Sequence, residues 1–196
     1  NLENGDMLEN YVKKILSSRV YELAQETPLT PAPLLSRRLG PQVFLKREDL
    51  QPVYSFKLRG AYNKISQLTD AQKAAGVITA SAGNHAQGVA MASKQLGIKA
   101  IIVMGRNTPS IKVNAVKDRG AKVILHGDNY DEASIHAKLL CKEQGLTFIP
   151  PYDDAEVIAG QGTIGLEIVN QHNGPIDAIF IPVGGGGLLA GVAAYV

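Results

Sequence analysis

The sequence predicts an α/β protein with an open parallel sheet and helices on both faces of that sheet. From residue 76 onward, short apolar β-like runs alternate with segments of helical periodicity, which is the pattern of a parallel sheet with crossover helices. The chain has 196 residues and 45% of them are hydrophobic, so it can bury a substantial core. In such sheets ligands bind beyond the carboxyl ends of the strands, so chemistry is expected in the strand-to-helix turns.

The elements are expected in the following order. Apolar residues at helical spacing predict a helix over 8–26, and the prolines at 28, 31 and 33 end it. A short helix at 34–39, a strand at 43–46 and a helix at 57–68 should follow. Strands are then expected at 77–80, 100–104, 123–126, 147–149 and 178–183. Helices are expected at 84–97, 109–119, 130–144 and 155–171, and again after residue 187.

The composition excludes several classes of protein. The net charge is +2 and the basic residues are diluted by nearby acids, which argues against a nucleic-acid site or a membrane-surface patch. No apolar run approaches the roughly 18 residues of a membrane helix. Cys141 is the only cysteine, so no intrachain disulfide can form and a reducing compartment, the cytoplasm, is expected. Cys141 lies on a helical pattern with alanines and is interpreted as a core residue.

Lys57 is the first candidate for chemistry. It lies between Phe56 and Leu58 in the stretch Ser55–Gly60, at the start of a predicted helix. An apolar setting removes hydration from an amine and lowers its pKa, and a neutral amine can form a Schiff base with an aldehyde. The alternative is a solvated lysine that opens a helix.

A glycine-rich turn at 184–187 is the second candidate. It follows a predicted strand and opens a helix, so its backbone N–H groups and the helix dipole favour a phosphate. No Gly-Lys-Ser/Thr follows, which excludes a P-loop, and the dinucleotide fingerprint also matches poorly. A plain flexible turn remains the alternative reading.

The turn Ser81–Gly88 is the third candidate. A hydroxyl, backbone N–H groups and the Asn84 amide converge on a helix start, which suits a carboxylate. Ser81 could instead be only the helix N-cap, and His85 could be a surface residue. Asn84 could also donate to a phenolate oxygen. An aldehyde for Lys57 and a phosphate for the glycines are both carried by pyridoxal 5′-phosphate, and the carboxylate would belong to an amino-acid substrate.

These motifs, together with Gly160-Gln161-Gly162-Thr163, resemble those of the tryptophan-synthase-type (fold type II) pyridoxal-phosphate enzymes along nearly the whole chain. Within that group the sequence is most similar to the biosynthetic threonine dehydratases, which carry out the first committed step of isoleucine biosynthesis. Ala82, Ala86 and the stretch 46–49 favour them over the serine dehydratases and serine racemase, which share much of the pattern.

The resemblance implies a role for each motif. Lys57, with Phe56 beside it, would hold the cofactor as a Schiff base, and the freed amine would later remove the α-proton of L-threonine. Asn84 would bind the cofactor's ring oxygen, and the phosphate would be bound by Gly184, Gly185, Gly186, Gly187 and Leu188. The substrate carboxylate would be received by the turn formed by Ser81, Ala82, Gly83, Asn84 and His85. The products would be 2-oxobutanoate and ammonia, and no metal ion is implied.

The resemblance also implies a two-lobed fold that is truncated on the C-terminal side. Residues 54–153 would form the small lobe, and 1–53 with 154–196 would form an incomplete large lobe. The complete enzyme would be a homo-oligomer, a tetramer in the family, with a regulatory domain after the catalytic one. The alternatives are an enzyme of the same fold that acts on L-serine, and an inactive fragment that only binds a phosphate ligand.

Overall fold

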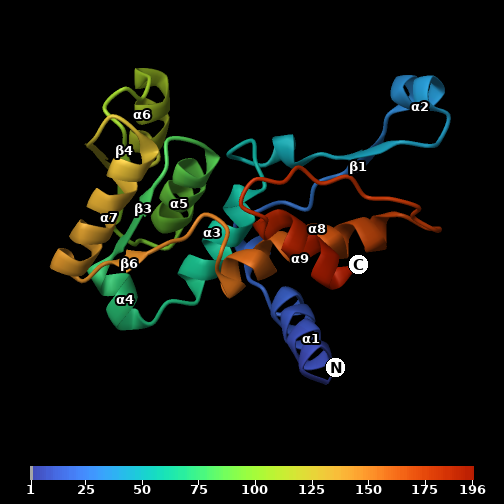
Figure 1. The fold of residues 1–196 in the computed structure, drawn as a ribbon, viewed down its shortest axis with the longest axis horizontal. Helices are drawn as coiled ribbons and strands as arrows, with labels where there is room; N and C mark the ends of the chain where they lie inside the picture. Colours follow the sequence, from blue (N-terminus) through green and yellow to red (C-terminus); the bar gives the residue numbers. More distant parts are fainter. Residues whose placement is uncertain (1) are drawn as a thin grey trace.

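The computed structural model describes residues 2–196, with side chains from residue 5 onward. Its centre is a four-stranded parallel sheet in the order β5 (Lys122–Leu125), β4 (Ala100–Met104), β3 (Val77–Ala80) and β6 (Thr147–Phe148). Val77 of β3 pairs with Ala100 on one side and with Thr147 on the other. The predicted parallel sheet is therefore confirmed (Figure 1).

Helices cover both faces of this sheet, as expected from the sequence. On one face, Val77, Ile102 and Met104 pack with residues of α5 (Asn84–Gln95) and α6 (Ser110–Lys117). On the other face, Ile78, Ala80 and Val103 pack with α7 (Tyr130–Gln144). Successive strand residues point to opposite faces, so both clusters come from the same strands. Cys141 packs against the α7 cluster and its Sγ lies 3.0 Å from the Leu146 carbonyl oxygen, in keeping with a core role.

A second group of helices lies beside the sheet. It consists of α1 (Leu2–Leu16), α8 (Ala155–Gln171) and α9 (Gly187–Tyr195), which pack on one another. Helix α3 (Lys57–Ser66) lies between the two groups and contacts both α5 and α8 (Figure 1). The residue that opens α3 is Lys57, so the candidate lysine lies where the two groups meet.

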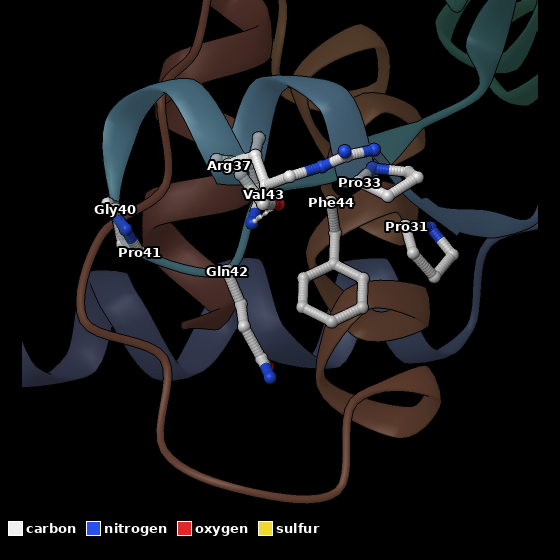
Figure 2. A pocket seen from close by; sticks show the side chains of 9 residues that line it. Pro31, Pro33, Arg37, Gly40, Pro41, Gln42, Val43 and Phe44 are labelled. Carbon is white, nitrogen blue, oxygen red and sulfur yellow. Dashed lines mark hydrogen bonds between the residues drawn. The ribbon is translucent and has the colours of Figure 1, made fainter.

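An arm precedes α3. Strands β1 (Leu29–Pro31) and β2 (Phe44–Lys46) pair antiparallel and flank the short helix α2 (Pro33–Leu39), with 3₁₀ turns at Val20–Glu22 and Glu48–Leu50. A hollow beside α2 is lined by three prolines and the Phe44 ring together with polar residues such as Arg37 and Gln42 (Figure 2). None of the predicted site residues lines it, so the candidate chemistry lies elsewhere.

Three sequence predictions need correction. The helix expected over 8–26 ends at Leu16, and only a 3₁₀ turn follows. Helix α4 (Asp70–Ala75) was not expected, although Thr69 and Gln72 form a capping box that marks its start. The strand expected at 178–183 is wrong: no strand within residues 2–196 pairs with it, and Phe180 is 94% exposed. An apolar run becomes a strand only where a neighbour completes the backbone hydrogen bonds.

Among the helices described in residues 2–196, none combines the length and the apolar character needed to span a bilayer.

Candidate active site

The order of the strands locates the site. From β3 the chain adds β4 and then β5 on one side, and it returns to place β6 on the other side of β3. Strands β3 and β6 therefore flank the point where the order reverses, which is where open α/β sheets bind ligands. Their carboxyl ends lead into the turn at Ser81 and into the segment 149–152.

Lys57 reaches this point from α3. Its Nζ donates a hydrogen bond of 2.6 Å to the carbonyl oxygen of Pro151, just beyond β6. The Nζ also lies 5.4 Å from the centre of the Phe56 ring and 6.0 Å from that of Tyr152. Partial burial among these groups lowers the pKa of the Lys57 amine below its usual value. The amine thus has the half-dehydrated setting that the sequence suggested.

The glycine-rich turn meets the same segment. A Cβ on Gly185 would lie 2.2 Å from the Tyr152 ring, and one on Gly187 would lie 2.9 Å from the Tyr152 carbonyl oxygen, so neither position has room for a side chain. Gly186 adopts a left-handed φ of 87° and is the N-cap of α9, without a side-chain cap. The first N–H groups of a helix have no acceptor within the helix, so they remain available to an anion. Tyr152 therefore lies between Lys57 and the glycine turn.

The turn Ser81–Gly88 approaches Lys57 through its helix. A Cβ on Gly88 would lie 3.2 Å from the Lys57 carbonyl oxygen, so α5 and the start of α3 meet backbone to backbone. The N-cap of α5 is Gly83 and no side chain caps this end. The Ser81 hydroxyl instead accepts a hydrogen bond from the Gly83 N–H, so the N-cap reading of Ser81 is wrong. Asn84 is exposed at the helix start, and Ala82 packs against the core.

His85 is placed differently from the other residues of this turn. Its side chain is only 4% exposed, and its Nε2 lies 3.0 Å from the Ile149 carbonyl oxygen, which also accepts from the Thr79 hydroxyl. Burial, and secondarily the charge of Lys57, lower the pKa of His85 to about 4 despite that hydrogen bond. The buried, neutral imidazole therefore contacts the Ile149 carbonyl at the start of segment 149–152.

This burial predicts a pH dependence of stability. The unfolded chain binds a proton at His85 near pH 6.5, while the folded chain does so only near pH 4. Between these values the unfolded state holds more protons, so the free energy of unfolding should fall by about 3 kcal/mol as the pH is lowered. Urea unfolding of the parent and His85→Gln at pH 7 and pH 4.5 tests this. The variant should lose less stability on acidification than the parent, and equal losses would contradict the assignment.

Sequence reasoning missed Pro151 and Tyr152, which connect the candidate motifs. Both lie in an irregular loop after β6, so no periodic pattern marks them. Their position beyond the carboxyl end of a predicted strand was the one available signal.

The sequence profile of the family described as "Pyridoxal-phosphate dependent enzyme" matches residues 20–196. The chain belongs to this family. Pyridoxal phosphate is accordingly the cofactor of its relatives, and the fold is that of the pyridoxal-phosphate family.

Individual pyridoxal-phosphate enzymes match closely. The chain is 59% identical over 196 residues to "Threonine dehydratase biosynthetic, chloroplastic" of Arabidopsis thaliana. The matched region covers 99% of the chain and 33% of that relative. It is 59% identical over 186 residues to "L-threonine dehydratase biosynthetic" of Pasteurella multocida, covering 95% of the chain and 36% of the relative. The chain thus spans about a third of the length of these curated relatives.

Solved structures of pyridoxal-phosphate enzymes have the same fold as this chain. The processed form of threonine deaminase isoform 2 from Solanum lycopersicum superposes with a TM-score of 0.95 at 55% identity, over 97% of this chain and 52% of that one. Maize serine racemase follows with a TM-score of 0.90 at 37% identity, over 94% of this chain and 56% of that one.

The residues present fit the cofactor of the pyridoxal-phosphate family. A half-buried primary amine suits its aldehyde, and the glycine turn offers backbone N–H groups to its phosphate where no side chain can enter.

Proposed function

We propose that the protein carrying this chain is a pyridoxal-phosphate-dependent threonine ammonia-lyase that converts L-threonine to 2-oxobutanoate and ammonia. The observation that carries the proposal is the contact series Lys57–Pro151–Tyr152–Gly185, which joins the amine to the glycine turn. The names of relatives at 55–60% identity support threonine as the substrate.

Lys57 and the glycine turn would hold the cofactor. The Lys57 amine would bind the aldehyde carbon, and the N–H groups of residues 184–188 would donate to the phosphate. Asn84, exposed at the start of α5, donates to the ring oxygen. When bound, the cofactor supplies an electron sink for the charge that develops at the substrate Cα.

The substrate is oriented by the other turn. The backbone N–H groups of residues 82–85 and the Ser81 hydroxyl receive the carboxylate at the dipole end of α5. The Lys57 amine would then take the α-proton as a general base, and the lowering of its pKa by burial favours the neutral form that this step needs. Fixing the carboxylate and the amine on two packed helices aligns the Cα–H bond for cleavage.

Reduction with borohydride tests whether Lys57 is the residue that binds the cofactor's aldehyde. Full-length protein mixed with pyridoxal phosphate and reduced should yield one modified peptide, the one that contains Lys57. Phosphate-ligand binding without this adduct would support the alternative of a module that only binds a phosphate.

Gly185→Ala should weaken cofactor binding about ten- to hundredfold, the equivalent of one charge-assisted hydrogen bond, because the added Cβ would push the turn off Tyr152. Gly5→Ala on α1 is the control outside the site, since a Cβ there meets nothing within 4 Å. Absorbance titration with pyridoxal phosphate measures both affinities. Equal affinities in the two variants would contradict the placement of the phosphate.

A serine-directed enzyme is the second candidate, and the TM-score of 0.90 to maize serine racemase favours keeping it. Turnover of L-threonine and L-serine should be compared, with a chiral assay for D-serine. Faster formation of pyruvate or D-serine than of 2-oxobutanoate would replace the threonine assignment.

We also propose the two-lobed organisation, the homo-oligomer and the cytoplasmic location. The lobes 54–153 and 1–53 with 154–196 are supported by the sheet and by the α1–α8–α9 group, although α3 contacts both. The homo-oligomer rests on the resemblance and is tested by sedimentation of the full-length protein. The cytoplasm is supported by the single unpaired Cys141, and cell fractionation separates it from the chloroplast named for the Arabidopsis relative.

A further inference from the structure

Arg59, two residues after Lys57, is completely buried and forms ion pairs with two carboxylates. Its Nε and Nη2 donate to the two oxygens of Glu48 at 2.8 and 2.6 Å. Its Nη1 and Nη2 donate to the two oxygens of Glu167 at 2.6 and 2.9 Å. Paired N–H···O bonds of this kind fix the plane of a guanidinium as well as its position.

The cluster is closed by further groups from the arm and from α8. Lys46 lies 2.5 Å from Glu167, the Tyr21 hydroxyl donates to Glu167 at 2.8 Å, and the Thr163 hydroxyl accepts from Arg59 at 3.0 Å. The two cations and two carboxylates balance, as buried charges require. The stretch 46–49, which the sequence analysis singled out, thus contributes Lys46 and Glu48 to this cluster.

The motif Gly160–Thr163 fixes α3 at the same place. A Cβ on Gly160 would lie 2.7 Å from the Arg59 carbonyl oxygen, so α3 and α8 cross with their backbones in contact. The Gln161 side chain accepts from the Gly60 N–H at 3.2 Å. The motif therefore holds the first turn of α3 at a set distance from α8.

Lys57 and Arg59 point to opposite sides of α3, because two residues turn a helix by about 200°. Holding Arg59 on one side therefore fixes the rotation of α3 about its axis and the direction in which Lys57 leaves it. We propose that Arg59, held by Glu48, Glu167 and Thr163, is the positioning residue that aims the Lys57 amine at the carbonyl of Pro151. This inference rests on the proposed function and extends it to a residue that touches neither cofactor nor substrate.

The test measures the Lys57 amine without the cofactor. Full-length protein, freed of bound cofactor with hydroxylamine and dialysis, is reductively methylated with formaldehyde and cyanoborohydride over a range of pH, and the peptide containing Lys57 is quantified by mass spectrometry. In Arg59→Lys, which keeps the charge but loses the paired donors, the pH midpoint of Lys57 labelling should rise by about one pH unit, as the amine regains water. Lysines 73 and 112, on α4 and α6, are the internal references in the same samples and should keep their midpoints.

Arg47→Lys is the matched control, since Arg47 lies in the same arm but pairs with Asp49 at the surface, and its Lys57 midpoint should equal that of the parent. Thr163→Val keeps the charge and nearly the size of the side chain but removes its bond to Arg59 and the hydroxyl's bond to the Gly160 carbonyl within α8, and it should shift the midpoint in the same direction by a smaller amount. If Arg59→Lys fails to fold, Thr163→Val decides. If Arg59→Lys folds and its Lys57 midpoint equals that of the parent, the proposal is overturned. If Arg59→Lys does not fold, an unchanged Lys57 midpoint in Thr163→Val overturns it. Because no cofactor is added, absence of the pyridoxal-phosphate adduct in the parent is a separate result that bears only on the proposed function.

Discussion

Lys57→Ala in the full-length protein is expected to abolish both the visible absorbance of the lysine-bound cofactor and the turnover of L-threonine. The variant loses the amine that attaches the cofactor and the base that removes the α-proton. The base alone accounts for about 10²–10⁴-fold in rate, so turnover should fall at least that far. Absorbance spectra and a 2-oxobutanoate assay measure the two losses.

Lys57→Arg is the informative companion, because it keeps the positive charge and much of the side-chain length but cannot act as the attached amine. It should be as inactive as Lys57→Ala. Lys73→Ala, at a partly exposed position of α4 away from Lys57, should match the parent in both assays. Retention of the absorbance and of turnover in Lys57→Ala would refute the assignment of this residue.

Glu167→Gln is expected to destabilise the fold by about 3–5 kcal/mol, the cost of leaving a buried charge without its partner. The Glu167 side chain is 3% exposed and its carboxylate faces Arg59, Lys46 and Tyr21. Desolvation opposes ionisation there, but the bonds from Arg59 prevail, so the pKa of Glu167 lies below its usual value and the group is charged at neutral pH. The variant would leave Arg59 paired with Glu48 alone and would take from Lys46 its carboxylate partner.

Chemical denaturation at pH 7 measures this loss, and Glu9→Gln provides the comparison. Glu9 also pairs with a lysine, Lys13, but both side chains are largely exposed on α1, so its replacement should leave the unfolding midpoint unchanged. Similar midpoints for Glu167→Gln and the parent would show that the cluster adds nothing to the stability of the fold.

Much of the fold could be predicted because its elements carry local signals. The runs 77–80 and 100–104 are strands, and 130–144 and 155–171 are helices, with the bounds that their periodicity indicated. The segment 178–183 shows the limit of such signals: it has the apolar composition of a strand, but strand formation depends on a neighbour that composition cannot supply.

The candidate site also contains residues that a local motif reveals and residues that only a long-range contact reveals. Lys57, the glycine turn and the Ser81–Gly88 turn could be found because each is a short contiguous motif. Tyr152 could not, since it acts through a contact with a glycine 33 positions later in the chain (185 minus 152). The cluster around Arg59 joins residues 46, 48, 59 and 167, and no local pattern pairs charges that lie so far apart in the sequence.

The crossing of α3 and α8 at Gly160 restricts which amino-acid substitutions this protein can tolerate. A side chain at residue 160 would collide with the carbonyl oxygen and carbonyl carbon of residue 59 and with the Cα of residue 60, all of them main-chain atoms. Main-chain atoms are common to every amino acid, so no replacement at residues 59 or 60 could make room. A selection for second-site suppressors of Gly160→Ala should therefore return revertants to glycine rather than compensating changes at those two positions.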